Sequence, residues 1–244
     1  MWYFSNIMLT DNTIINKGRI FMKRKILSLF LCSLMLTGSV CGCDSKSDLS
    51  QSGSSTITDI PAEAMERLNK AHDIEPVIAP KEEWDTEKIC NSFYINGKQF
   101  SYPCTINELG EGFEIIDTEE YKLKYDKDKK TGSCYLSYYG KTVVNVRLYD
   151  CQNIADISDS PIGGMAFMQD LNKDYVFPVS FNGVTIGDNI ERVFDRLSFL
   201  ESYSDVWEDE TEFYSFNYEN EDIKIYCLCI NDCVTDISFN FKQK

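Results

Sequence analysis

Apolar side chains along the chain follow three patterns, which predict a signal segment, short helices and strands. A continuous apolar run covers residues 26–36, directly after three cations at positions 23–25. Two later stretches place apolar residues three and four positions apart, which is the spacing of one helix face. Beyond Trp84, most segments alternate apolar and polar residues, as a strand with one solvent-facing side does. The pattern predicts an α+β fold that follows a processed N-terminal segment.

Residues 22–43 have the layout of a secretory signal peptide, because the apolar run is too short to span a bilayer. The ending Val40-Cys41-Gly42-Cys43 resembles the lipobox of bacterial lipoproteins. In those proteins the cysteine after a small residue receives fatty acyl (palmitate) chains and becomes the mature N-terminus. Cys43 is therefore the predicted lipidation site. Two alternatives are Cys41, which follows the branched Val40, and ordinary cleavage without lipid.

The segments on either side of the signal peptide carry little apolar pattern. Residues 1–21 are predicted to be an upstream extension, either from an earlier start codon or as a long leading region. Residues 44–60 are rich in serine and form the predicted flexible tether. A helix capped by Asp59 is expected next, and we assign it with the tether to a stalk over 44–84, outside the core.

A first folded unit is predicted over residues 85–155. Its elements, in chain order, are a strand that reaches the Asn96-Gly97 turn, a helix that a capping box opens at Thr105–Glu108 and Gly110 stops, a strand at 121–125, a charged turn at 126–132 and a hairpin about Gly140.

A second unit is predicted over 156–244 with the same order of elements. These are a strand that reaches Asn182-Gly183, a helix that a capping box opens at Asp188–Glu191, an acidic loop at 205–212 and strands at 213–218, 223–230 and 233–241. The stretch 154–174, with a turn at Gly163-Gly164, is the predicted boundary. The predicted fold is thus two tandem units, each a short helix packed on an antiparallel β-meander.

Two segments of the second unit carry a resemblance to a known family. Residues 183–197 and 230–239 resemble turn, helix and strand segments of small, uncharacterised lipoproteins of Gram-positive bacteria. The fold of that family is similar to the outer-membrane-assembly small lipoproteins and to the tandem repeats of β-lactamase inhibitory protein. The resemblance implies a tandem fold and a binding role.

The net charge of the chain limits the classes of partner that we expect it to bind. The chain after Cys43 holds 19 of the 24 Lys and Arg residues and 38 of the 39 Asp and Glu residues, a net charge of −19. Such a surface repels nucleic acid and anionic lipid headgroups. The expected partners are therefore the membrane, reached through the N-terminal lipid, and a protein or cell-wall component.

Candidate catalytic groups are few. The only histidine, His72, falls in the predicted stalk, which excludes Ser-His-Asp and histidine-based metal sites. The segment Asp126–Gly132 resembles a calcium loop, but Lys130 occupies a ligand position, so we expect a solvated turn. The carboxylates of 205–212 are the one set suited to acid–base chemistry, and a solvated loop is expected there too. The sequence predicts no catalytic, cofactor-binding or metal-binding residue.

Seven cysteines follow Cys43, an odd number with no CxxC pair. We expect most of them to be small buried hydrophobic residues, with one or two disulfides possible and no assigned pairing. They are Cys90, Cys104, Cys134, Cys151, Cys227, Cys229 and Cys233.

The expected function is that of a non-enzymatic binding module, lipid-anchored on the extracytoplasmic face of the cell membrane. The alternatives are an envelope assembly or scaffold factor, which rests on the resemblance alone, and a glycan-active enzyme that uses two carboxylates.

Overall fold

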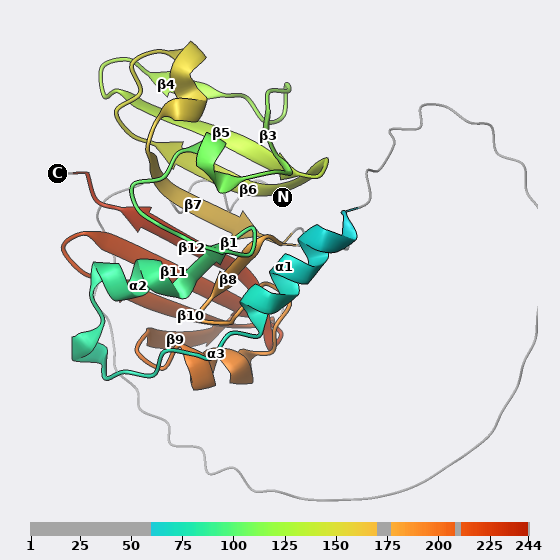
Figure 1. Ribbon diagram of the computed structural model, residues 1–244. Coiled ribbons are helices and arrows are strands. Elements are labelled where there is room, and N and C mark those ends of the chain that lie inside the picture. The colour runs from blue at the N-terminus through green and yellow to red at the C-terminus, as the bar shows by residue number, and fades with distance from the viewer. Residues whose placement is uncertain (1–59, 170–176, 208–210, 244) are drawn as a thin grey trace, which may run out of the picture. The chain divides into compact units, whose positions relative to one another are not determined.

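A nine-stranded antiparallel sheet runs through the part of the chain that the structure describes (Figure 1). The structure is a computed structural model, and it describes residues 60–169, 177–207 and 211–243. The strand order is β3-β5-β6-β7-β12-β11-β10-β9, and β4 also pairs with β5. The strands are β3 (Phe113–Ile116), β4 (Lys124–Asp126), β5 (Thr131–Tyr138), β6 (Lys141–Leu148), β7 (Ile162–Met168), β9 (Glu201–Val206), β10 (Glu212–Glu219), β11 (Ile223–Ile230) and β12 (Cys233–Phe241). The predicted α+β class is confirmed.

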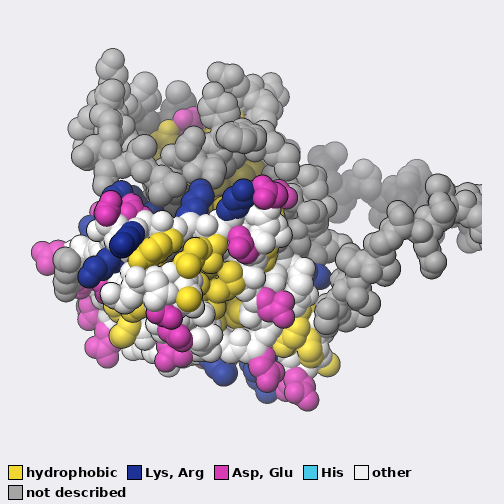
Figure 2. Space-filling model, turned by 90° about the horizontal axis from the view of Figure 1, so that it is seen from above, with side chains coloured by type: hydrophobic (Ala, Val, Ile, Leu, Met, Phe, Trp, Pro, Cys, Tyr) yellow, Lys and Arg dark blue, Asp and Glu magenta, His cyan; other side chains and the backbone are white. Residues whose placement is uncertain are grey.

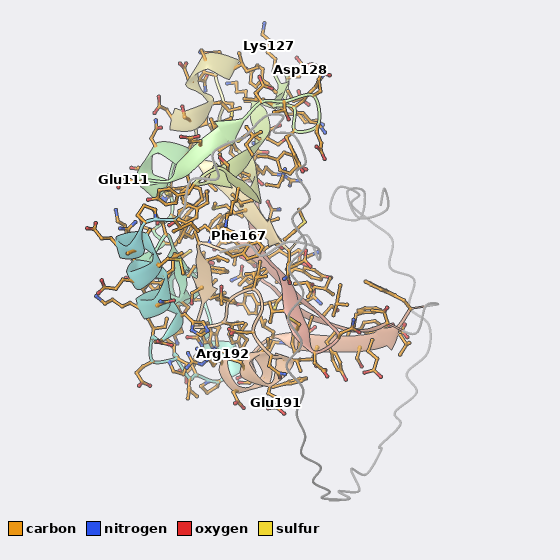
Figure 3. All side chains as sticks on the ribbon, turned by 90° about the vertical axis from the view of Figure 1, so that its right-hand side faces the viewer. Glu111, Lys127, Asp128, Phe167, Glu191 and Arg192 are labelled. Carbon is orange, nitrogen blue, oxygen red and sulfur yellow. The ribbon has the colours of Figure 1, made fainter. Side chains whose placement is uncertain are left out.

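The helices and a second, three-stranded sheet all lie on one face of the large sheet (Figures 1 and 3). The order in the small sheet is β2-β1-β8. Its contact with the large sheet is aromatic, since the rings of Phe93 and Phe239 lie 5.0 Å apart. These elements are α1 (Ala62–His72), η2 (Lys81–Glu83), α2 (Thr86–Ser92), β1 (Phe93–Ile95), β2 (Lys98–Gln99), η3 (Ile106–Leu109), η4 (Ile154–Asp159), β8 (Val179–Phe181) and α3 (Ile190–Arg196).

The core lies between these elements and the inner face of the large sheet. Alternate residues of each strand point inward, as the period of two requires. Full burial of one such side chain stabilises the fold by roughly 1.5–3 kcal/mol. Inward residues that are at most 3% exposed include Cys134, Leu136, Tyr138, Val144, Val146, Leu148, Met165, Phe167, Phe216, Ile225, Cys227, Ile237 and Phe239.

Two predicted hairpins are confirmed. β5 and β6 are joined at Tyr139-Gly140, where φ is 49° and 79°. β11 and β12 are joined at Asn231-Asp232, where φ is 51° and 62°. Positive φ at both central residues gives the turn whose twist matches the flanking strands.

The two predicted Asn-Gly turns leave opposite ends of the antiparallel β1–β8 pair. In both turns the Asn and the Gly have positive φ. The Asn96 backbone N–H donates to the Pro178 carbonyl, and the Asn182 N–H donates to the Ser92 carbonyl. Each side-chain amide donates to the last residue of the following helix, Leu109 of η3 at 3.2 Å or Arg196 of α3 at 2.6 Å. Each turn is thereby tied to its helix.

Helix α1 packs across both turns, so the prediction that it belongs to a stalk outside the core is wrong. A Cβ atom on Gly97 would lie 2.7 Å from the Arg67 carbonyl oxygen, and one on Gly183 would lie 3.0 Å from that of His72. Ala64 and Ala71 are buried beneath the helix. The predicted cap, Asp59, lies outside the described residues.

Two segments that were predicted as loops form strands β7 and β9 in the structure. Gly163 and Gly164 lie inside β7, not in a turn. The predicted acidic loop begins in β9, which includes Asp205. A smaller correction concerns the strand expected at 121–125, because only its end forms β4.

The two predicted capping boxes had different outcomes. Thr105 and Glu108 form the predicted box at the start of η3, which is a 3₁₀-helix, and Gly110 ends it with φ 93°. The box at α3 is wrong by one residue. Asn189 is the N-cap and accepts from the Glu191 N–H at 2.9 Å, while Asp188 has other partners.

Candidate functional site

The outer face of the large sheet is the candidate binding surface. No helix of the described residues lies on it, since all of them lie on the inner face (Figures 1 and 3). Phe167, labelled in Figure 3, points to the inner side from the centre of the sheet, so its strand neighbours Ala166 and Met168 point outward. The register of each strand pair then assigns the other outward residues.

The middle of the outer face is made of tyrosine, asparagine and small side chains. One row across six neighbouring strands pairs Tyr135, Asn145, Ala166, Ser238, Tyr226 and Asn217 in that order. The next row contains Arg147, Gly164, Asn240 and Lys224. Tyrosine supplies rigid contact area at low entropic cost, and Ser, Asn and Gly supply adaptable hydrogen bonding, as in the binding loops of antibodies. The outer face is therefore suited to binding another macromolecule.

In the middle of this face, the ionisable groups of Asp236 and Tyr226 have shifted pKa values. Burial raises the pKa of Asp236 to about 6, against a hydrogen bond from Thr235 that lowers it. Burial also raises the pKa of Tyr226 to about 12, with the Asp236 charge adding to the shift. At neutral pH Asp236 is thus a poorly hydrated carboxylate and Tyr226 a neutral phenol.

At the β9 end, three aromatic rings adjoin the outer face. The ring of Phe213 lies 6.2 Å from that of Tyr203 and 5.0 Å from that of Trp207. Tyr203 donates its hydroxyl to the Asp205 carboxylate at 2.7 Å. That hydrogen bond lowers the pKa of Asp205.

Two carboxylates of the predicted acidic loop lie in the described residues and do not face each other. Asp205 pairs with Phe213, and Glu212 pairs with Val206, the next residue along β9. Neighbouring residues of a strand point to opposite faces, so Asp205 and Glu212 lie on opposite faces of the sheet. These two residues therefore lack the facing arrangement that a glycosidase pair needs.

His72 lies in a polar cluster that fixes the end of α1. His72 Nε2 lies 3.1 Å from Asp188 Oδ1, and Arg192 Nε lies 3.3 Å from Asp188 Oδ2. Arg192 also donates to the His72 carbonyl at 2.9 Å, and Arg196 donates to the Ile74 carbonyl at 3.0 Å. These donors satisfy carbonyls at the C-terminal end of the helix. The cluster thus serves to dock α1, and a groove of about 390 Å³ lies beside it.

Asp188→Ala is expected to cost about 1–3 kcal/mol of stability, more than Asn189→Ala, which should cost about 0.5–2 kcal/mol. Asp188 is only 16% exposed, and its loss removes the acceptor of the Thr185 N–H and the partner of His72 and Arg192. Asn189→Ala removes only the cap of α3. Urea unfolding of both variants measures the difference, and a larger loss for Asn189→Ala would contradict this role of Asp188.

The solvated turn predicted at Asp126–Gly132 is confirmed for residues 127–130, while Asp126 ends β4 and Gly132 lies buried in β5. Asp126 Oδ1 accepts from the N–H groups of Asp128 and Lys129 at 3.0 and 3.1 Å. Lys127 and Asp128 project from the tip of this hairpin (Figure 3). Among the described residues, no group of three or more His, Cys, Asp or Glu side chains is arranged to hold a metal ion. Figure 2 shows the same end of the molecule from above, with apolar side chains among acidic and basic ones.

All seven cysteines of the described part are free thiols, and six of them are buried. The prediction that most are small buried hydrophobic residues is confirmed. Burial raises the pKa of Cys134 to about 12 and that of Cys90 to about 11. These thiols are protonated at neutral pH and are poor nucleophiles.

Comparison with protein-family models, with curated proteins and with solved structures finds no match to the chain. Cys43 lies outside the described residues. In the described ranges, no helix has the length and apolar character needed to cross a membrane.

Sequence reasoning identified most of the strands but did not identify the outer face as a site. That face depends on which strands are neighbours, and β7, its central member, was predicted as a turn. The outward pattern was nevertheless present in the strands that were predicted, where Tyr135, Asn145 and Tyr226 alternate with apolar residues.

Proposed function

We propose that the protein is a lipid-anchored, extracytoplasmic binding module whose outer sheet face docks a protein or cell-wall partner. One observation carries the binding part of this proposal: six paired strands present Tyr, Asn, Ser, Ala and Gly outward, and no described helix covers them. Interfaces between macromolecules use such rigid aromatic and adaptable polar side chains. The negative charge of the chain disfavours nucleic acid as the partner, because like charges repel.

We further propose that the binding module is a tandem repeat, with β1 to β7 as one unit and β8 to β12 as the other. The order β3-β5-β6-β7 is mirrored by β12-β11-β10-β9 across the β7–β12 pair. The Asn96 and Asn182 turns make equivalent hydrogen bonds on the two sides of the β1–β8 pair. The boundary then follows Met168, within the stretch 154–174 but later than the division at 155–156 that the sequence predicted, because β7 belongs to the first unit. Pairing of two units explains how a small chain builds a surface of this width.

Lipid anchoring is supported by the lipobox-like ending at Cys43. Cys43→Ser is expected to release the protein from the membrane fraction or to leave it unprocessed, because stable anchoring needs at least two acyl chains. Labelled palmitate and membrane fractionation measure this. Label that enters Cys43→Ser but not Cys41→Ser would assign the lipid to Cys41.

Ala166→Arg is expected to weaken partner capture by about tenfold or more, since it places a long cation in the middle of the outer face. The readout is recovery of envelope components on the immobilised full-length protein. Ala62→Arg is the matched control, because Ala62 is exposed at the start of α1. Equal capture by both variants would place the partner elsewhere on the molecule.

A further inference from the structure

The strand at one end of the large sheet offers a second surface, separate from the middle of the outer face. β9 pairs with β10 along one side, and none of the described residues pairs with its other side. All six of its residues are exposed. In such an edge strand, alternate N–H and C=O groups point away from the sheet and can pair with another extended chain.

The side chains of β9 show which kind of chain this edge would accept. Its acidic residues, Glu201 and Asp205, lie on the outer face, four residues or roughly 13 Å apart. The strand contains no Lys or Arg. Tyr203 lies between the two carboxylates on the same face, and the rings of Phe213 and Trp207 adjoin Asp205. A carboxylate beside aromatic rings is a suitable site for Lys or Arg, which gains both ionic and cation–π contacts.

The same charges disfavour pairing with a second copy of the chain. If two β9 strands paired about Tyr203, Glu201 of one copy would lie opposite Asp205 of the other. Like charges directly opposite each other destabilise a strand pair. Lys81 Nζ lies 2.5 Å from Glu201 Oε1, but both side chains are well exposed, at 47% and 76%. An ion pair this exposed contributes little to stability, so a cation of the partner can replace Lys81 beside Glu201.

We propose that β9 is a docking strand for an extended, cationic segment of a partner protein, which adds to the sheet as a further strand. The segment carries Lys or Arg at two positions four residues apart, opposite Glu201 and Asp205. An apolar residue midway between them lies against Tyr203. Because this site lies at the sheet edge, experiments can disprove it without affecting the proposed role of the middle of the outer face.

The test uses the full-length protein in mild detergent and a synthetic peptide, Thr-Lys-Thr-Val-Thr-Lys-Thr. Binding is followed by fluorescence anisotropy, and hydrogen exchange at 201–206 is followed by mass spectrometry. The peptide is expected to bind and to slow exchange in β9. An isomer with its lysines three residues apart, which places them on opposite faces, should bind about tenfold more weakly, equivalent to about 1.4 kcal/mol.

Two kinds of change, substitutions in β9 and N-methylation of the peptide, distinguish the contribution of charge to binding from that of backbone hydrogen bonds. The double substitution Glu201→Lys and Asp205→Lys should weaken binding by about tenfold or more, and a peptide with Glu in place of Lys should then bind. Glu114→Lys on β3, at the opposite end of the sheet, is the matched control and should bind as wild type. N-methylation of those alternate peptide nitrogens that point toward β9 should abolish binding if the peptide adds as a strand, whereas methylation of the other set should not.

Several results would overturn the proposal. One is the absence of peptide binding to the wild-type protein. Another is undiminished binding of the peptide methylated on the nitrogens that point toward β9, which would show attraction by charge alone. A third is dimerisation of the protein with slowed exchange in β9 before peptide is added, which would make a second copy the occupant. Because Ala166 is remote from β9 in the strand order, Ala166→Arg should leave peptide binding unchanged.

Discussion

Phe167→Ala is expected to lower the free energy of unfolding by about 3–5 kcal/mol. Phe167 is fully buried on β7, the strand that joins β6 to β12. Its inward neighbours are Val144 on one side and Ile237 on the other. Loss of the ring leaves a cavity at the join between the proposed units, where the surrounding strands are held by pairing on both sides and can collapse little.

Met168→Ala is the matched control for this prediction. Met168 is the next residue of the same strand, points to the outer face and is 43% exposed. Its truncation should cost less than about 1 kcal/mol. Urea unfolding followed by circular dichroism measures both variants. A similar loss for both would mean that the assignment of inner and outer faces at β7 is wrong.

Asn182→Asp is expected to cost about 3–5 kcal/mol, although the two side chains have nearly the same shape. The Asn182 amide is fully buried and donates to the carbonyls of Val77 at 3.0 Å and Arg196 at 2.6 Å. A carboxylate has no hydrogen to donate, so both carbonyls would face an acceptor. The substitution therefore removes the donor to two partly buried carbonyls and adds a poorly solvated charge.

The equivalent Asn96→Asp should also destabilise the protein, but less. Its amide donates to the carbonyls of Leu109 and Glu111, while the Arg67 guanidinium lies 3.4 Å from Asn96 Oδ1 and offsets part of the new charge. Asn91→Asp, at an exposed position of α2, is the control and should change stability by less than about 0.5 kcal/mol. If Asn96→Asp left the free energy of unfolding unchanged while Asn182→Asp lowered it strongly, the two turns would not be structurally equivalent.

The sequence predicted the backbone conformation correctly wherever that conformation depends only on the residues of one short segment. The Asn-Gly turns, the hairpins at Gly140 and Asn231-Asp232 and the Thr105–Glu108 box depend on residues that tolerate positive φ or reach their own backbone. The alternating pattern of β11 and β12 predicted their bounds as the structure has them, because one face of each strand is buried. Such features need no knowledge of distant neighbours.

The errors have a common physical cause, which is packing between segments far apart in the sequence. Gly163 lies in β7, which pairs with β6 and β12, and glycine is required there because a Cβ atom would lie 2.4 Å from the ring of Tyr149. The sequence alone does not show that Tyr149 is a neighbour, and a Gly-Gly pair by itself predicts a turn. Asp188 has the spacing of a helix cap, but its carboxylate contacts His72, 116 residues earlier in the chain.

The sequence by itself determined the α+β class, the Asn-Gly and hairpin turns and the charge, because each depends on composition or on residues within a few positions. The lipid anchor at Cys43 stays a prediction. Only the tertiary structure decided that α1 packs across both Asn-Gly turns and that β7 joins the strands into one sheet. It also decided which side chains share the outer face. Strand neighbours are chosen by burial of apolar surface over the whole chain, and no local pattern encodes that choice.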